Sequence, residues 1–297
     1  MKKKIVSIIV PCYNHADFIG GTLDSILAQD FDDFEVIVGD DASTDGSRDA
    51  ISHFKDRIRP FFFNKNRGYF ATVNDLFHQV RGDYVHIFSS DDLYMPGFLS
   101  ASMKLMLNND LKLTCSNIRY FSSDKEFRDT HLYDAENPIA FHKENIIQVF
   151  RNSDFWVPGV SCITEVNTLK KYGLPNPKLE NISDWFLFHQ IALFEGIGYL
   201  PQLGIAMREQ IGSYTAKVKK DRKRRNATYF AVLELVAKDI HMRKRFRDSA
   251  ILGFIFDNLF WKLILKPKWW DFFICGKVSP WKRIFKSLKK RMLRSCS

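Results

Sequence analysis

The sequence of 297 residues predicts an α/β fold: a doubly wound, mostly parallel sheet of the Rossmann-like kind, followed by a C-terminal helical appendage. Over the first hundred residues, short apolar runs rich in β-branched side chains alternate with segments of helical period, which is typical of βαβ units. The last eighty residues are basic and aromatic and lack this alternation. At 45% hydrophobic content, the chain can bury a core as one large domain with an appendage.

The first predicted strand covers residues 5–10, an apolar run that we expect to be buried on both faces. Three lysines precede it, but the run is too short for a signal peptide and has no cleavage site of small residues. Apolar residues at helical spacing between Phe18 and Leu27 then predict a helix, and residues 34–38 predict the second strand.

The alternation continues to about residue 100. Residues 59–63 predict a third strand, residues 69–80 a helix and residues 83–88 a fourth strand. Pro96 is expected to open another helix, because proline is favoured at the first helical position. Residues 115–215 carry mixed strand and helix signals with several prolines, and we interpret them as the second half of the same globule.

Three polar stretches directly follow predicted strands, at residues 11–15, 40–46 and 89–93. In open parallel sheets, ligands bind outside the carboxyl ends of the strands. Because a loop that only connects core elements does not need so many polar side chains, we expect these stretches to line a ligand site.

Several motifs occur in a fixed order at these predicted strand ends: residues 6–14, 23–29, 34–46, 66–68 with Asn74, 82–84 and 90–96. In this order they resemble the opening of family 2 of the inverting glycosyltransferases, which have the GT-A fold. The resemblance is strong over the first hundred residues and weaker from there to about residue 215. It implies a GT-A domain over residues 1–215, with a nucleotide-binding half at about 1–115 and an acceptor half at about 116–215.

The resemblance also implies a reaction. The protein would move a sugar from a nucleotide-diphosphate-sugar, with a UDP-sugar as the first expectation, to a hydroxyl of a glycan or lipid-linked acceptor with inversion. The expected role is in cell-surface polysaccharide synthesis.

Breaking the bond from the anomeric carbon to phosphate leaves a dianionic nucleoside diphosphate, so the site must stabilise negative charge. A Mn²⁺ or Mg²⁺ ion held by carboxylates can do this. By resemblance, Asp92 would bind the metal, and Asp91 would face the metal shell or the nucleotide. The alternative is that the pair only caps the helix expected near Pro96. Ser89 stands where many family members carry a further Asp, which leaves fewer carboxylates for a metal.

The residues that the resemblance assigns to the nucleotide sugar are Pro11, Tyr13, Asn14, Asp41, Asn66, Arg67 and Asp91. Asp41 would accept the N–H of the base, Pro11 and Tyr13 would form the pocket wall, and the Arg67 guanidinium could pair with a phosphate. The alternatives remain open: an ordinary turn for Asp41, a core aromatic for Tyr13 and a solvated surface side chain for Arg67.

An acceptor hydroxyl needs a base that takes its proton as it attacks. By resemblance this base is Asp184, near the start of a helix in the acceptor half, although Ser183 stands where Glu is common. The alternative is that Ser183 or Asp184 caps a helix whose Trp185, Phe188 and Ala192 face the core. We expect His189 to be a packing or supporting residue rather than a second base.

The tail has a different chemistry from the body. Residues 217–297 hold 23 Lys and Arg and 6 Asp and Glu, a net charge of +17, whereas residues 1–216 have a net charge of −7. The charge run at 217–225 has the composition of a solvated linker. The apolar run at 246–266 is interrupted by Asp257, Asn258 and Lys262, so no stretch reaches the ~18 apolar residues that a membrane span needs. Residues 281–294 alternate apolar and basic side chains at helical spacing, which is typical of a helix lying in a membrane surface.

We therefore expect residues 246–297 to bind an anionic membrane surface, with the protein cytoplasmic and peripheral on the inner face of the plasma membrane. A helical cap packed on the catalytic domain is the alternative, and no nucleic-acid partner is expected. Five scattered cysteines without a CxxC pair fit a reducing compartment.

Two other classes of protein fit parts of the sequence. A nucleotidyltransferase could share the sheet and the carboxylate pair, but the N-terminal loop has no glycine-rich basic phosphate motif. A non-catalytic nucleic-acid-binding protein would explain the basic tail and leave the acidic body unexplained.

Overall fold

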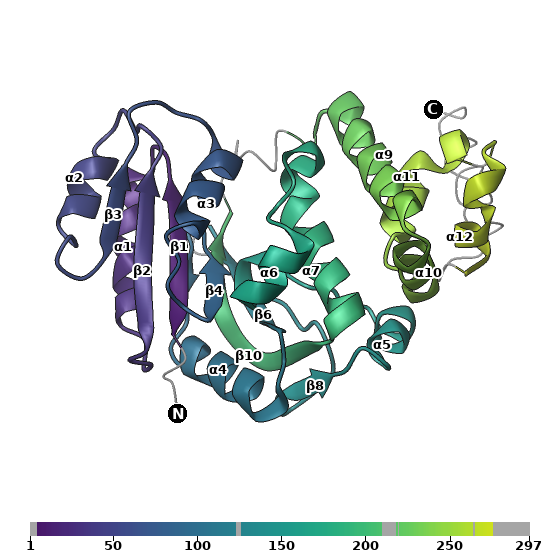
Figure 1. Ribbon diagram of the computed structural model, residues 1–297, viewed down its shortest axis with the longest axis horizontal. Helices are drawn as coiled ribbons and strands as arrows, with labels where there is room; N and C mark the ends of the chain where they lie inside the picture. Colours follow the sequence, from purple (N-terminus) through teal and green to yellow (C-terminus); the bar gives the residue numbers. More distant parts are fainter. Residues whose placement is uncertain (1–4, 123–125, 210–217, 219, 264, 276–297) are drawn as a thin grey trace.

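The computed structural model describes residues 5–122, 126–209, 218, 220–263 and 265–275. Its centre is a ten-stranded mixed sheet with helices on both faces and a group of helices at one end (Figure 1). The predicted α/β class is confirmed.

The first four parallel strands form one half of the sheet. They are β1 (Val6–Cys12), β2 (Phe34–Asp40), β3 (Arg59–Phe62) and β4 (Tyr84–Ile87), in the order β3-β2-β1-β4. All three pairings are parallel. All seven residues of β1 are buried, which explains why its sequence is a continuous apolar run rather than an alternating one.

The other half of the sheet is mixed. Next to β4 lies β9, which runs antiparallel to both β4 and β6, while β6 and β10 pair in parallel. The short strands β5 and β8 pair antiparallel with β10, and β7 pairs antiparallel with β6. The bounds are β5 (Leu93–Tyr94), β6 (Leu113–Phe121), β7 (Phe127–Asp129), β8 (Ile139–Phe141), β9 (Ile163–Glu165) and β10 (Ile197–Arg208).

Alternate residues of the central strands enter two different cores. Ile8 and Val10 join the core beneath α1, α2 and α4, whereas Ile9 joins the core beneath α3, as the period of two in a strand requires. The bounds are α1 (Ala16–Leu27), α2 (Ser47–Ser52), α3 (Tyr69–Phe77) and α4 (Phe98–Asn109). The helix expected from Pro96 starts at Phe98, after Gly97 in the left-handed region at φ 76°.

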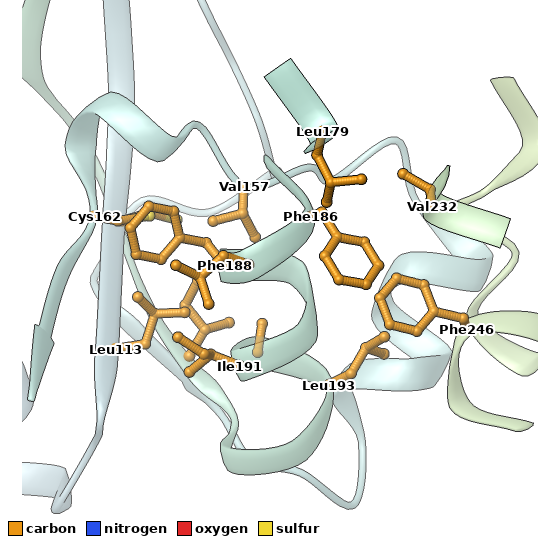
Figure 2. Packing of buried hydrophobic residues seen from close by; sticks show 14 of the residues in the cluster. Leu113, Val157, Cys162, Leu179, Phe186, Phe188, Ile191, Leu193, Val232 and Phe246 are labelled. Carbon is orange, nitrogen blue, oxygen red and sulfur yellow. The ribbon is translucent and has the colours of Figure 1, made fainter. Parts of the chain in front are cut away.

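The helix α7 (Ser183–Glu195) is buried on nearly every side. It lies between the sheet and the C-terminal helices, so apolar side chains surround its axis (Figure 2). A helix enclosed in this way has no polar stripe in its sequence. The neighbouring elements are α5 (Ile146–Asn152), the 3₁₀ turn η1 (Gly159–Ser161), α6 (Val166–Tyr172) and the 3₁₀ turn η2 (Pro177–Ile182).

The described C-terminal helices share this core. The Phe186 ring of α7 stacks on the Phe246 ring of α10 with centroids 5.3 Å apart and planes 14° apart (Figure 2). Residues 222–225, predicted as linker, form the first turn of α9. The bounds are α9 (Arg222–Lys238), α10 (Ile240–Ser249), α11 (Gly253–Leu263), the 3₁₀ turn η3 (Pro267–Trp269) and α12 (Trp270–Cys275).

The described part of the tail therefore packs as a helical cap. Within the described part of the chain, no helix has the length and apolarity to cross a membrane. The amphipathic helix predicted at 281–294 lies outside the described residues.

Phe246→Ala should lower the free energy of unfolding by about 3–5 kcal/mol, because it removes a fully buried ring from the core shared by α7 and α10. Ile240→Ala on the same helix is the matched control. Its side chain is 77% exposed, so the change should stay within about 0.5 kcal/mol. Equilibrium denaturation measures both, and equal effects would show that α10 does not share the core.

Candidate active site

The loops after β1 and β2 are joined by hydrogen bonds between their polar residues. The Asn14 side-chain oxygen accepts the backbone N–H of Thr44 at 2.8 Å, and the Asn14 N–H donates to the Ser43 hydroxyl at 2.9 Å. Asn14 has φ 54°, a left-handed conformation that Asn tolerates. Pro11 is buried in β1, and Tyr13 beside it is 44% exposed. The loop therefore presents Tyr13 at the sheet edge.

The two adjacent aspartates after β2 have different surroundings. Asp40 Oδ2 accepts the Ser43 N–H at 3.2 Å and the Arg48 Nε–H at 2.7 Å. Asp40 therefore stabilises the turn that follows β2. Asp41 instead points to the loop before α3. Its carboxylate accepts the Gly68 N–H at 2.7 Å and the Arg67 N–H at 3.0 Å.

Asp41 thus joins the β2 loop to the loop at residues 66–68. Gly68 has φ 84°, a conformation open to glycine, and the Asn66 side-chain oxygen also accepts its N–H at 3.1 Å. The Arg67 side chain lies over the Phe63 ring at 4.5 Å and pairs with Asp75 at 2.5 Å. In this structure Arg67 contributes its backbone to the site, and its guanidinium is held by Asp75.

The carboxylate pair after β4 lies beside β10. Asp92 is 3% exposed, and its Oδ1 accepts the Arg208 N–H at 2.7 Å. The Ser89 hydroxyl donates to Asp91. Burial, and next the neighbouring Asp91 charge, raise the pKa of Asp92 well above its usual range. Gly97 is the N-cap residue of α4 and no side chain caps that helix, so Asp91 and Asp92 do not serve as caps.

Arg208 is a site residue that the sequence analysis missed. Its Nε donates to the Asp91 carbonyl at 3.1 Å, and its guanidinium lies over the Phe18 ring at 4.6 Å and the Phe121 ring at 4.5 Å. A cation is thereby held against the backbone of the Asp91–Asp92 loop, where its charge acts on Asp92. No sequence motif marks Arg208, which is 117 residues from Asp91.

These loops share one edge of the sheet. The Asp41 N–H donates to the Cys12 carbonyl at 2.8 Å, and the Phe88 N–H donates to the Ile9 carbonyl at 2.9 Å. Because β1 lies between β2 and β4, the loops that carry Asp41 and Asp92 lie on either side of the loop after β1. That loop contacts the β4 loop as well, since His15 Nδ1 lies 2.7 Å from the Ser90 hydroxyl.

Asp184 lies in the first turn of α7, beside Gly159. A Cβ atom on Gly159 would stand 2.2 Å from Asp184 Oδ2, so only glycine leaves room for the carboxylate. Burial raises the pKa of Asp184 above its ordinary value of 3.8. The residue before the helix is Ile182, with no side-chain cap, and the buried Ser183 hydroxyl has no hydrogen-bond partner. Neither Ser183 nor Asp184 therefore serves as the N-cap residue.

Tyr69 connects the two halves of the site. It follows Gly68 at the start of α3, and 46% of it is exposed. Partial burial, and then the charge of Asp184, raise the pKa of Tyr69. The loop that Asp41 holds thus borders Asp184.

Two carboxylates are available to a metal ion. Among the described residues, no group of three or more His, Cys, Asp or Glu side chains could hold one. Mg²⁺ and Mn²⁺ sites in nucleotide enzymes need only one or two carboxylates, because phosphates and water complete the shell. Mutual repulsion within the Asp91–Asp92 pair is what a divalent cation would relieve. The residues present fit such an ion.

Residues 7–165 match the model of the family described as glycosyl transferase family 2. Among curated proteins, the chain is 28% identical over 192 residues to an uncharacterized glycosyltransferase of Rickettsia typhi, covering 63% of this chain and 59% of the relative. It is 28% identical over 138 residues to the putative teichuronic acid biosynthesis glycosyltransferase TuaG of Bacillus subtilis, covering 46% and 55%. The chain thus spans somewhat more than half the length of these relatives.

Solved structures agree in fold. S. aureus TarS 1-349 in complex with UDP-GlcNAc superposes with a TM-score of 0.65 at 17% identity, covering 89% of this chain and 76% of that one. The mannosyltransferase PcManGT from Pyrobaculum calidifontis, in complex with GDP-Man and Mn²⁺, gives 0.60 at 16% identity, covering 99% and 81%. The family model covers more than half of the chain, and the sheet edge collects the residues of its motifs. The chain belongs to glycosyltransferase family 2, with the GT-A fold.

Proposed function

We propose that the protein transfers a sugar from a UDP-sugar to a hydroxyl of a glycan or lipid-linked acceptor, with inversion, in cell-surface polysaccharide synthesis. The observation that carries the proposal is that the loop after β1 contacts both neighbouring loops. Asn14 binds Thr44 of the Asp41 loop, and His15 binds Ser90, next to the Asp91–Asp92 pair. The names of TuaG and the UDP-GlcNAc complex of TarS support a polysaccharide product and a UDP donor. The GDP-Man complex of PcManGT makes a GDP-sugar the alternative donor.

The nucleotide would bind along the sheet edge. Asp41 is fixed by two backbone N–H groups, and a carboxylate has further lone pairs with which to accept the N–H of a base. Exposed Tyr13 and buried Pro11 would form the wall of the nucleotide pocket. Asn14 would hold the loops after β1 and β2 together.

The diphosphate would lie at Asp91 and Asp92. A Mn²⁺ or Mg²⁺ ion there would neutralise the charge that develops on the departing diphosphate. The Arg208 guanidinium, held between two aromatic rings, supplies a fixed positive charge at the same place. A charge that is already oriented costs little reorganisation when the bond breaks.

Asp184 would act as the base for the acceptor hydroxyl. Its ionised carboxylate takes the proton as the oxygen attacks the anomeric carbon on the face opposite the leaving diphosphate, which inverts the configuration. Burial raises its pKa, and a stronger base with a higher pKa is better matched to a neutral operating pH.

The described end of the tail presents a surface suited to anionic lipid. Leu265 is 83% exposed and Trp270 is 52% exposed, while Lys262, Lys266 and Lys268 are exposed beside them. Apolar side chains flanked by lysines are typical of interfacial segments. We propose that this corner, within the basic segment 246–297, holds the enzyme on the inner face of the plasma membrane, near a lipid-linked acceptor.

Asp92→Ala should abolish metal-dependent hydrolysis of the donor and sugar transfer, because the diphosphate loses its metal ligand. Asp110→Ala, an exposed carboxylate at the end of α4, is the control and should keep activity. A panel of nucleotide sugars with Mn²⁺ measures both. Equal activity in the two variants would contradict the metal role.

Transfer should fall as the pH drops through the raised pKa of Asp184, because only the ionised carboxylate accepts the proton. The acidic limb of the kcat profile should therefore lie above the range of an ordinary Asp. Asp184→Asn should lower kcat by about 10²–10⁴-fold and keep UDP binding. A wild-type rate that stays constant through the acidic range would exclude Asp184 as the base.

Lys266→Glu combined with Lys268→Glu should weaken binding to anionic liposomes about tenfold or more, since each lysine near the surface contributes about 1 kcal/mol. The matched control reverses two exposed lysines elsewhere, Lys104 and Lys178, for the same change in net charge. Flotation at low salt gives the bound fraction. An equal loss of liposome binding in both double variants would show that this corner does not bind the membrane.

A further inference from the structure

Two buried histidines hold the short segment at residues 157–160. This segment contains Gly159, the residue against which the Asp184 carboxylate rests. His86 reaches one end of the segment from β4, and His189 reaches the other end from α7. Neither histidine has a role in the chemistry proposed above.

The hydrogen-bond partners decide the tautomer of His86. Its Nε2 lies 2.8 Å from the Val160 carbonyl, which can only accept, so Nε2 carries the proton. Nδ1 is then an acceptor, and it receives the hydroxyl hydrogen of Tyr94. Residues 86 and 94 also bracket the Asp91–Asp92 loop, so His86 joins that loop to the segment beside Asp184.

His189 has the opposite tautomer. Its Nδ1 lies 2.7 Å from the Trp185 carbonyl and therefore donates, while its Nε2 accepts the Val157 N–H at 3.2 Å. Trp185 follows Asp184 in the first turn of α7. His189 thereby fixes the distance between that turn and the segment.

Both rings stay neutral. Each histidine is 0–1% exposed, and burial lowers the pKa of His86 to about 4 and that of His189 to about 3. The two hydrogen-bond patterns therefore persist throughout the neutral range, as a rigid support requires.

We propose that His86 and His189 are positioning residues that clamp the segment 157–160 between β4 and α7 and so fix the place of Asp184 relative to Asp91 and Asp92. The proposal rests on the proposed role of Asp184 as the base. Displacing a reacting group by about 1 Å can lower a rate by about 10²-fold, so the clamp acts on kcat and leaves donor binding alone.

The test compares asparagine and glutamine at each histidine. The Asn amide reaches as far as Nδ1 of the imidazole, whereas the Gln amide reaches as far as Nε2. His86→Asn and His189→Asn lose the contact with the segment, and kcat of sugar transfer should fall about 10- to 100-fold. His86→Gln and His189→Gln keep a donor or acceptor at Nε2 and should recover most of the rate, while the Kd for UDP with Mn²⁺ stays unchanged in all four.

Gly159→Ala is the second, independent variant, because it pushes Asp184 away without touching either histidine. It should also lower kcat and keep UDP binding. The control is Gly20→Ala in α1, where an added Cβ meets nothing within 4 Å. Ile26→Ala, a core truncation in α1, controls for lost stability: it should lower Tm and keep kcat at temperatures where the protein is folded.

The outcomes separate the two proposals. Wild-type kcat in both Asn variants, or a parallel loss of kcat and UDP affinity, would overturn the clamp. A wild-type protein that transfers no sugar from any nucleotide donor would instead overturn the proposed function.

Discussion

The structure depends on one contact between two loops, the pair of hydrogen bonds from the Arg67 and Gly68 backbone to the Asp41 carboxylate. A buried carboxylate needs such partners, since an uncompensated charge in the interior is costly. The pair also fixes the start of α3, and with it Tyr69, at the border of the acceptor half. The same interaction thus satisfies a buried charge and sets the geometry of the site.

The second half of the molecule places one side chain, Asp184, against that edge. It does so with a helix enclosed by apolar contacts on both sides, including the Phe186–Phe246 stack with the C-terminal helices (Figure 2). Close-packed cores transmit displacements rather than absorbing them. The described C-terminal helices therefore support α7, the helix whose first turn carries Asp184.

The sequence was most informative where motif and strand are adjacent. The loops with Asp41 and Asp92 follow apolar runs directly, so the strands and the polar loops at their carboxyl ends could be predicted together. The roles of Arg208 and Gly159 could not be predicted, because their contacts leave no local pattern in the sequence. Arg208 contacts Asp91, 117 residues away, and Gly159 contacts Asp184, 25 residues away. The burial of α7 could not be predicted either, because a helix that is apolar on all sides does not indicate which elements pack against it. Nor could the helical structure of residues 222–225, because a basic run has the same composition in a linker and in a helix.

The most direct test of the account is a crystal structure with UDP and Mn²⁺, in which the anomalous signal locates the metal. The account predicts the manganese peak at Asp92, the uracil beside Asp41, and the diphosphate between the two and within reach of Arg208. A peak remote from Asp91 and Asp92, or a nucleotide bound away from the carboxyl ends of β1, β2 and β4, would contradict it.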